Sequence, residues 1–98
     1  VSNVTNMKGM FFKSIFNGDI SKWDVSCVTN MSAMFVYSKF NGDISEWNVS
    51  SVNDIHGMFC HSEFNGDISQ WAVSNGVNKT NMFLDSPLEN NPPKWYKR

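Results

Sequence analysis

The sequence predicts an α/β fold, a solenoid of four 24-residue coils in which each coil has a short helix followed by a short parallel strand. Two observations carry this prediction: a tryptophan recurs every 24 residues, and a Met-Phe pair recurs at the same interval. A repeat of this length is typical of supersecondary units that bury their apolar faces only by stacking on one another. The tryptophans are Trp23, Trp47, Trp71 and Trp95. We expect a single domain over residues 1–98, with coils 1–24, 25–48, 49–72 and 73–98.

The helix of the first coil is expected within residues 1–11, with Ser2 as its N-cap. Apolar residues there recur every three or four positions, which suits one face of a short helix. The methionines of this stripe could offer thioether ligands to a metal. The stripe must face inward, however, so core packing explains it better. These methionines are Met7, Met10, Met31, Met34, Met58 and Met82.

A turn is expected at Asn17-Gly18-Asp19 and at its copies, residues 41–43 and 65–67. Glycine permits unusual backbone angles there, and Asn and Asp side chains can bond the nearby backbone. Stacked copies would form either a ladder of turns or a row of carboxylates that cradles calcium. The sequence lacks the second Asp-bearing loop that repeat calcium sites use, which favours the turn ladder. We expect no cofactor.

The parallel strand is expected through Trp23 to Val25, with Trp and Val facing inward and their neighbours facing outward. The outward positions differ between the copies while the tryptophan stays the same. Repeat solenoids use extended faces for recognition, so we predict that a protein or glycan ligand binds this strip. An ordinary solvated surface is the alternative. The strip consists of Lys22, Asp24, Glu46, Asn48, Gln70 and Ala72.

The fourth coil has the features of a C-terminal cap. Pro92 and Pro93 stand where the other copies have Ile and Ser, and proline cannot donate to a sheet ladder. No matching cap precedes residue 1, so we expect further sequence or a partner to cover the N-terminal edge. Self-association through that edge is the predicted mode of assembly.

Charge and composition favour neither nucleic acid nor membrane as a partner. The chain has 8 Lys+Arg against 9 Asp+Glu, a net charge of −1, which gives no attraction toward polyanions. No stretch approaches the roughly 20 consecutive apolar residues that a membrane span needs. Cys27 and Cys60 occupy different positions of the repeat, so stacking alone would not pair them in a disulfide.

Candidate catalytic and metal-binding residues are few. His56, Cys60 and His61 lie close together in the sequence, but a closed zinc site needs four ligands and no second cluster follows. The chain also lacks a nucleophile, a base and an orienting residue at a recognisable spacing. We therefore expect no enzymatic activity.

The repeat resembles known families at two levels. The spacing of Ile20, Trp23, Val25 and Val28 is similar to that of a leucine-rich repeat, with Trp in one leucine position. The longer string Phe-Asn-Gly-Asp-Ile-Ser-x-Trp-x-Val-Ser-x-Val-Thr-Asn-Met-x-x-Met-Phe, which starts at Phe16, resembles the BspA-type leucine-rich-repeat-like family of bacterial surface proteins and lipoproteins. This resemblance covers residues 1–98 and implies a cell-surface or secreted adhesion or host-interaction module with no catalytic residues.

The expected function is therefore a non-catalytic surface module that binds a protein or glycan. The alternative is a structural spacer or self-assembly segment that stacks through its N-terminal edge.

Overall fold

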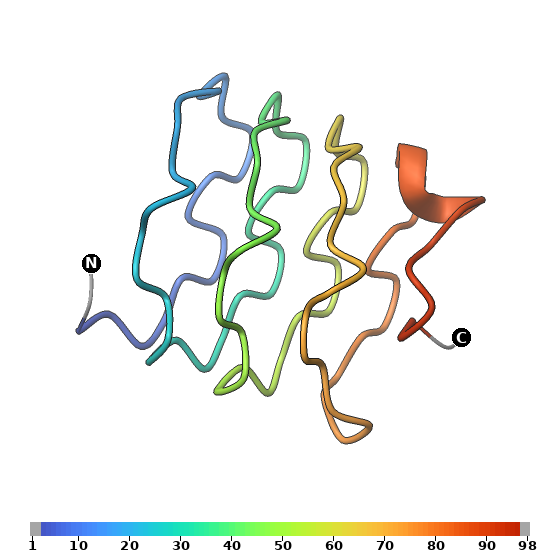
Figure 1. Cartoon of the computed structure of the whole chain (residues 1–98). Helices are drawn as coiled ribbons and strands as arrows, with labels where there is room; N and C mark the ends of the chain where they lie inside the picture. Colours follow the sequence, from blue (N-terminus) through green and yellow to red (C-terminus); the bar gives the residue numbers. More distant parts are fainter. Residues whose placement is uncertain (1–2, 97–98) are drawn as a thin grey trace.

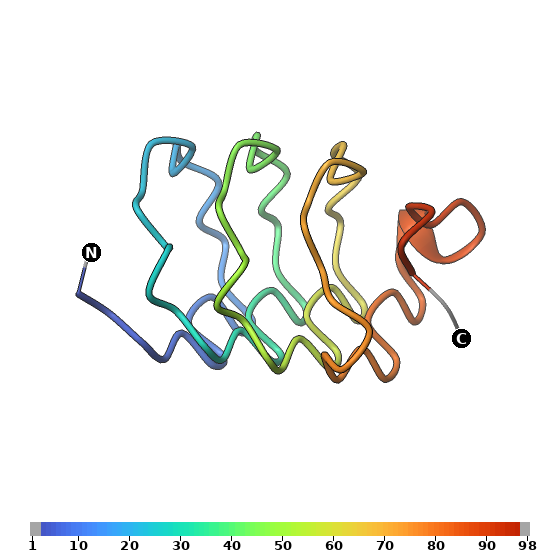
Figure 2. The same cartoon turned by 60° about the horizontal axis from the view of Figure 1, so that its bottom comes forward.

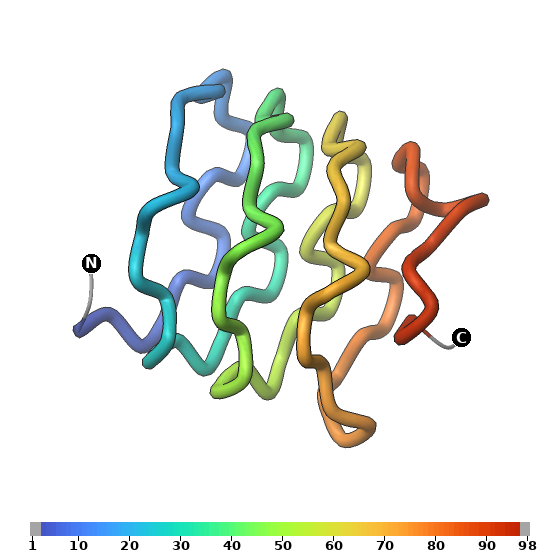
Figure 3. Tube along the Cα trace, in the orientation of Figure 1, coloured from blue at the N-terminus to red at the C-terminus, as the bar shows by residue number. Residues whose placement is uncertain are grey.

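The copies of the repeat lie side by side along one axis, and the chain begins and ends at opposite ends of the stack (Figures 1 and 3). This computed structural model describes residues 3–96, so the predicted N-cap, Ser2, lies outside the described residues. The copies remain adjacent when the molecule is turned by 60° (Figure 2). We call residues 1–24, 25–48, 49–72 and 73–98 the first to fourth copies.

The predicted α/β solenoid of helix-plus-strand coils is wrong. Within residues 3–96 the only helix is η1, a 3-10 helix over Pro87–Glu89, and the only β contacts are isolated parallel bridges that form no sheet. The leucine-rich-repeat description fails with it, because these copies contain no regular helix and strand. No helix in this part of the chain is long and apolar enough to cross a membrane. The bridges are Asn6–Asn30, Asn30–Asp54 and Asp54–Asn78.

Overlapping turns replace the predicted helix. The Met7 carbonyl accepts the Met10 N–H at 3.2 Å, and the Phe11 carbonyl accepts the Ser14 N–H at 3.0 Å. Within these turns Gly9 has a φ of +63°, a left-handed conformation that ends any right-handed helix. All the positive-φ residues among those described fall at two positions of the repeat. These are Gly9, Ala33, Gly57 and Asn81 at one position, and Lys13, Tyr37, His61 and Asp85 at the other.

The same segment joins each copy to the next. The N–H groups of Met7, Gly9 and Phe11 point out of the turns and donate to carbonyls of the second copy at 2.8, 3.0 and 2.9 Å. Equivalent bonds run from Phe35 to Met58 and from Phe59 to Met82, both at 2.9 Å. Alternate N–H groups thus serve the turn and the neighbouring copy. The residues predicted to be helical therefore carry the backbone contacts that were expected of the strand.

The predicted parallel strand is a second set of turns. Trp23 N–H donates to the Ile20 carbonyl at 3.1 Å, so its backbone bonds its own copy rather than a neighbour. Copies are joined here by side chains, since the indole N–H of the second, third and fourth copies donates to an isoleucine carbonyl of the preceding copy. The pairs are Trp47 to Ile20 at 3.0 Å, Trp71 to Ile44 at 3.0 Å and Trp95 to Ile68 at 2.9 Å.

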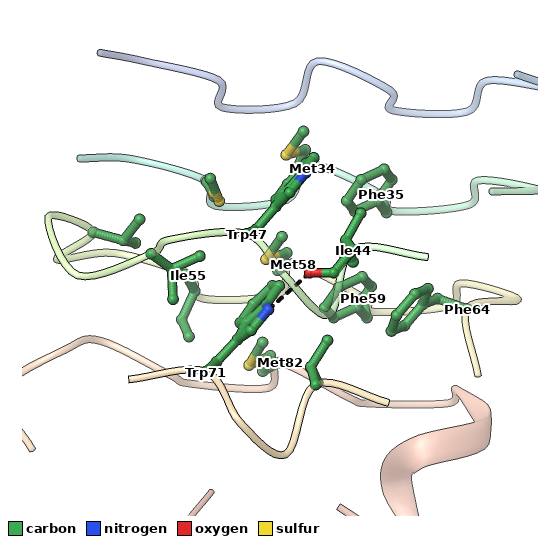
Figure 4. Packing of buried hydrophobic residues seen from close by; sticks show 14 of the residues in the cluster. Met34, Phe35, Ile44, Trp47, Ile55, Met58, Phe59, Phe64, Trp71 and Met82 are labelled. Atoms are coloured by element: carbon green, nitrogen blue, oxygen red, sulfur yellow. Dashed lines mark hydrogen bonds between the residues drawn. The ribbon is translucent and has the colours of Figure 1, made fainter. Parts of the chain in front are cut away.

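The core is built from columns of equivalent side chains (Figure 4). Phe35 and Phe59 stack with ring centroids 5.4 Å apart and planes within 2° of parallel. Trp47 and Trp71 are buried, as expected for the centre of the stack. Five of the six methionines are buried as predicted, but Met10 is 47% exposed. Its first-copy position explains the difference, because no earlier copy in the described residues covers it.

Candidate functional site

The structure exposes all six residues of the predicted strip, Lys22, Asp24, Glu46, Asn48, Gln70 and Ala72. They flank the tryptophans, of which Trp47 and Trp71 are buried and Trp23 partly buried. Since adjacent copies lie side by side, the strip forms two rows that cross three copies (Figure 1). The surface beneath it is a series of tryptophan turns, not the parallel sheet that was expected.

The row of Asp24 and Asn48 is partly engaged in local turns. Asp24 Oδ1 accepts hydrogen bonds from Ser26 N–H at 3.0 Å and from Ser26 Oγ–H at 2.6 Å. The Ser26 hydroxyl and then its backbone N–H lower the pKa of Asp24. Asn48 makes the same two bonds to Ser50, at 3.1 and 2.7 Å, with a neutral amide oxygen. This row therefore has one charged side chain, and hydrogen bonds to the following serines restrain both Asp24 and Asn48.

The row of Lys22, Glu46 and Gln70 is available to a partner. None of these side chains makes a hydrogen bond or salt bridge to another residue in the described part of the chain. Their polar end groups are an ammonium, a carboxylate and an amide, which together offer hydrogen-bond donors and acceptors.

The corner at Asn17-Gly18-Asp19 is a ladder of turns. Asp19, Asp43 and Asp67 each accept the N–H of the serine two residues later, at 2.9 Å in all three cases. Bonds to these serines lower the pKa of all three carboxyl groups. The Asn17 amide oxygen also accepts Asn41 N–H at 2.8 Å, and the Asn41 oxygen accepts Asn65 N–H at 2.8 Å. Hydrogen bonds to backbone thus confirm the turn-ladder interpretation.

His56, Cys60 and His61 point to different neighbours. His56 Nδ1 lies 2.8 Å from Asp54 Oδ1, whereas His61 stacks on Tyr37 at 4.8 Å and its Nδ1 lies 3.5 Å from Asp85 Oδ2. Burial raises the pKa of the Cys60 thiol, which keeps it protonated and a poor nucleophile. Residues 3–96 contain no group of three His, Cys, Asp or Glu side chains placed to hold a metal ion.

Sequence reasoning predicted self-association through the N-terminal edge but did not name the exposed apolar residues there; we define this edge as residues 5–16. Met10 is 47%, Phe12 49%, Ile15 87% and Phe16 37% exposed. Met34 and Phe40, the counterparts of Met10 and Phe16 in the second copy, are fully buried. Phe12 and Ile15 were the available signal, since the second and third copies have Val, Cys, Lys or Glu at those positions.

A groove of about 550 Å³ lies at the other end of the stack. One side is the C-terminal edge, which we define as residues 77–85, and Tyr96 contributes to the other. The Tyr96 ring meets Phe83 edge-on, with centroids 4.9 Å apart, so it covers the last member of the phenylalanine column. The lining residues are Val77, Asn78, Lys79, Thr80, Asn81, Phe83, Leu84, Glu89 and Tyr96.

Comparison with known proteins gives a family but no characterised relative. No curated protein and no solved structure matches the chain. Residues 1–95 match one family across all four copies of the repeat. The chain therefore belongs to the DUF285 family, described as "Mycoplasma protein of unknown function".

Proposed function

We propose that this chain is a non-catalytic interaction module, displayed on a cell surface or secreted, that binds a protein or glycan. The binding face is the strip of Lys22, Asp24, Glu46, Asn48, Gln70 and Ala72. The observation that carries the proposal is the exposure of all six side chains beside tryptophans that are the same in every copy. The surface location rests on the resemblance to BspA-type surface proteins.

The tryptophan turns make the strip a rigid platform. Trp47 and Trp71 lie between its members, and each indole donates to a carbonyl of the preceding copy at 3.0 Å. A partner that docks here orders only side-chain ends, which lowers the entropic cost of binding. The three unengaged heads of Lys22, Glu46 and Gln70 can bond either glycan hydroxyls or the polar surface of a protein.

The test is a triple variant, Lys22→Ala with Glu46→Ala and Gln70→Ala, probed on an array of immobilised glycans and on extracellular-matrix proteins by surface plasmon resonance. We expect affinity for any ligand of the wild-type chain to fall at least about tenfold, since several polar contacts of about 0.5–1.5 kcal/mol each are lost. The matched control is Lys39→Ala with Glu63→Ala, which removes an exposed ion pair outside the strip. Equal binding by the two variants would exclude the strip.

A second function, self-assembly by stacking, is favoured by the exposed side chains of the N-terminal edge. Large apolar patches on a monomer's surface mark interaction sites. Sedimentation velocity over a wide range of concentrations tests this function, with Phe12→Lys as the variant. We expect the weight-average mass of the wild-type chain to rise with concentration. The mass of the variant should stay at that of the monomer. A constant wild-type mass would count against assembly.

A further inference from the structure

The backbone leaves complementary groups at the two ends of the stack. At each internal junction, N–H groups of one copy donate to carbonyls of the next, as Gly9 does to Ser32 at 3.0 Å and Gly57 does to Thr80 at 2.9 Å. The first copy therefore has a row of carbonyls with no donor among residues 3–96, and the fourth has a row of N–H groups with no acceptor there. The carbonyls are those of Asn6, Lys8 and Met10, and the N–H groups those of Lys79, Asn81 and Phe83.

Side chains at the two ends also match. One column contains Lys13, Tyr37, His61 and Asp85, with Tyr37 stacked on His61 at 4.8 Å and His61 Nδ1 3.5 Å from Asp85 Oδ2. If the column continued into a second molecule, Asp85 would meet Lys13. In the neighbouring column, Leu84 would meet Phe12, and these residues are 39% and 49% exposed.

We propose that the C-terminal edge of one molecule binds the N-terminal edge of a second molecule of the same protein. The two molecules lie head to tail, in the register of the internal junctions. Lys79, Asn81 and Phe83 N–H groups then donate to the carbonyls of Asn6, Lys8 and Met10. The Asp85 carboxylate pairs with the Lys13 ammonium, and Leu84 packs on Phe12. This inference rests on the self-assembly function and names its partner surface and register.

Tyr96 opposes this association. Inside the stack each phenylalanine of the column is covered by the next one, as Phe59 covers Phe35 at 5.4 Å. Phe83 is last and only 1% exposed, because Tyr96 meets it edge-on at 4.9 Å. Phe11 of the second molecule reaches Phe83 only when Tyr96 swings out. Tyr96 therefore competes with the second molecule for Phe83 and weakens assembly.

The geometry sets the form of the assembly. Two different edges meet, so the interface is heterologous, and each added molecule presents the same free edges again. The weight-average mass then rises with concentration and reaches no plateau at the dimer. A pairing of two N-terminal edges about a two-fold axis would stop at the dimer instead.

The first test compares the wild-type chain with Tyr96→Ala by sedimentation velocity, with circular dichroism as the check on folding. We expect association of Tyr96→Ala to be about two- to tenfold tighter, because the aromatic contact of Tyr96 with Phe83 no longer competes with it. A plateau at the dimer, or weaker association of Tyr96→Ala, would overturn the proposal.

The second test is a charge exchange between two chains. Lys13→Asp alone and Asp85→Lys alone each bring like charges together at the junction, so each should associate about two- to fivefold more weakly than wild type. An equimolar mixture restores opposite charges at every mixed junction and should recover the loss. Lys22→Asp alone is the control, because it makes the same charge change outside the N-terminal edge and leaves Asp85 and Lys13 in place, and it should associate as tightly as the wild-type chain.

The outcomes separate this proposal from the functions on which it rests. Association that ignores the charge exchange would overturn the head-to-tail register and leave self-assembly in place. Monomers for both wild type and Tyr96→Ala at every concentration would overturn register and self-assembly together. Neither result bears on ligand binding by the strip.

Discussion

Trp71 donates its indole N–H to the backbone carbonyl of Ile44, 3.0 Å away in the preceding copy (Figure 4). Trp71 is only 4% exposed, so water cannot replace the bond if the donor is lost. The tryptophan thus fills the core and gives a second donor to a carbonyl that already accepts the Trp47 N–H at 3.2 Å within its own turn. This side of the stack has indole bonds in place of a strand ladder.

We predict that Trp71→Phe lowers the free energy of unfolding by about 1–3 kcal/mol, because the buried Ile44 carbonyl loses one of its two donors and the smaller ring leaves space unfilled. Urea denaturation followed by circular dichroism measures the change. Trp23→Phe is the matched control, since the Trp23 indole N–H donates to no acceptor within residues 3–96. Equal losses in the two variants would show that ring volume, and not the hydrogen bond, is responsible.

Ala33 and Gly57 allow a reciprocal test of the left-handed turns. They occupy the same position of the repeat, with φ of +55° and +61°. Gly57→Ala should destabilise by about 1–2 kcal/mol, the cost of a left-handed non-glycine residue. Ala33→Gly should stabilise by up to about 1 kcal/mol, because the same strain is relieved. A Cβ at Gly57 meets no atom closer than 3.9 Å, so strain and not crowding is measured. Opposite signs in thermal unfolding are expected, and equal signs would contradict this account of the turns.

Gly66 packs its backbone against a phenylalanine that cannot move. A Cβ there would lie 2.7 Å from the Phe64 ring, which is fully buried. We expect Gly66→Ala to cost about 1–3 kcal/mol of stability, as overpacking does in a filled core. Gly18→Ala creates the same clash with Phe16, but that ring is 37% exposed and can turn away. A clearly smaller loss in Gly18→Ala, measured by urea titration, would confirm the difference.

The serine-bonded carboxylates predict a loss of stability in acid. Their pKa values are lowered in the folded chain, while the unfolded chain has the ordinary value of about 3.9. Their contribution is therefore complete above that value and is lost as pH falls through the lowered pKa. Asn can keep the turn bonds without titrating, as Asn48 shows. The test is a variant that carries Asp19→Asn, Asp24→Asn, Asp43→Asn and Asp67→Asn together. Its midpoint of urea unfolding should fall less than that of the wild-type chain between about pH 5 and pH 2.

Sequence patterns identified most of the core but not its backbone. Ile44, Met58 and Phe59 were expected inside and are buried, because a fixed period brings the same apolar residue to the same place in each copy. The helix prediction failed because overlapping turns also turn every third or fourth side chain inward. Glycine at positions 9 and 57 and asparagine at position 81 were the signal for a left-handed residue. Ala33 has the same left-handed conformation, but alanine gives no sequence signal for it.

The candidate surfaces were predicted unevenly for a similar reason. Exposure of the strip followed from variation between the copies beside an unvarying tryptophan. Met10 and Phe16 could not be distinguished from Met34 and Phe40 by residue type or phase. Only their place at the end of the stack exposes them, and that depends on tertiary structure.

The columns of equivalent side chains have a consequence for the gene. Each junction repeats the contacts of the last, as the bonds from Asn41 to Asn17 and from Asn65 to Asn41 show, both spanning 24 residues. Duplication of one whole unit would insert a copy that makes the same contacts with its neighbours on both faces as the existing copies do. An insertion of a single codon within one copy would move the later residues of that copy out of the columns at its junctions with both neighbours. Such a protein can lengthen in whole steps through unequal recombination, whereas a small insertion disturbs the junctions of the copy that contains it.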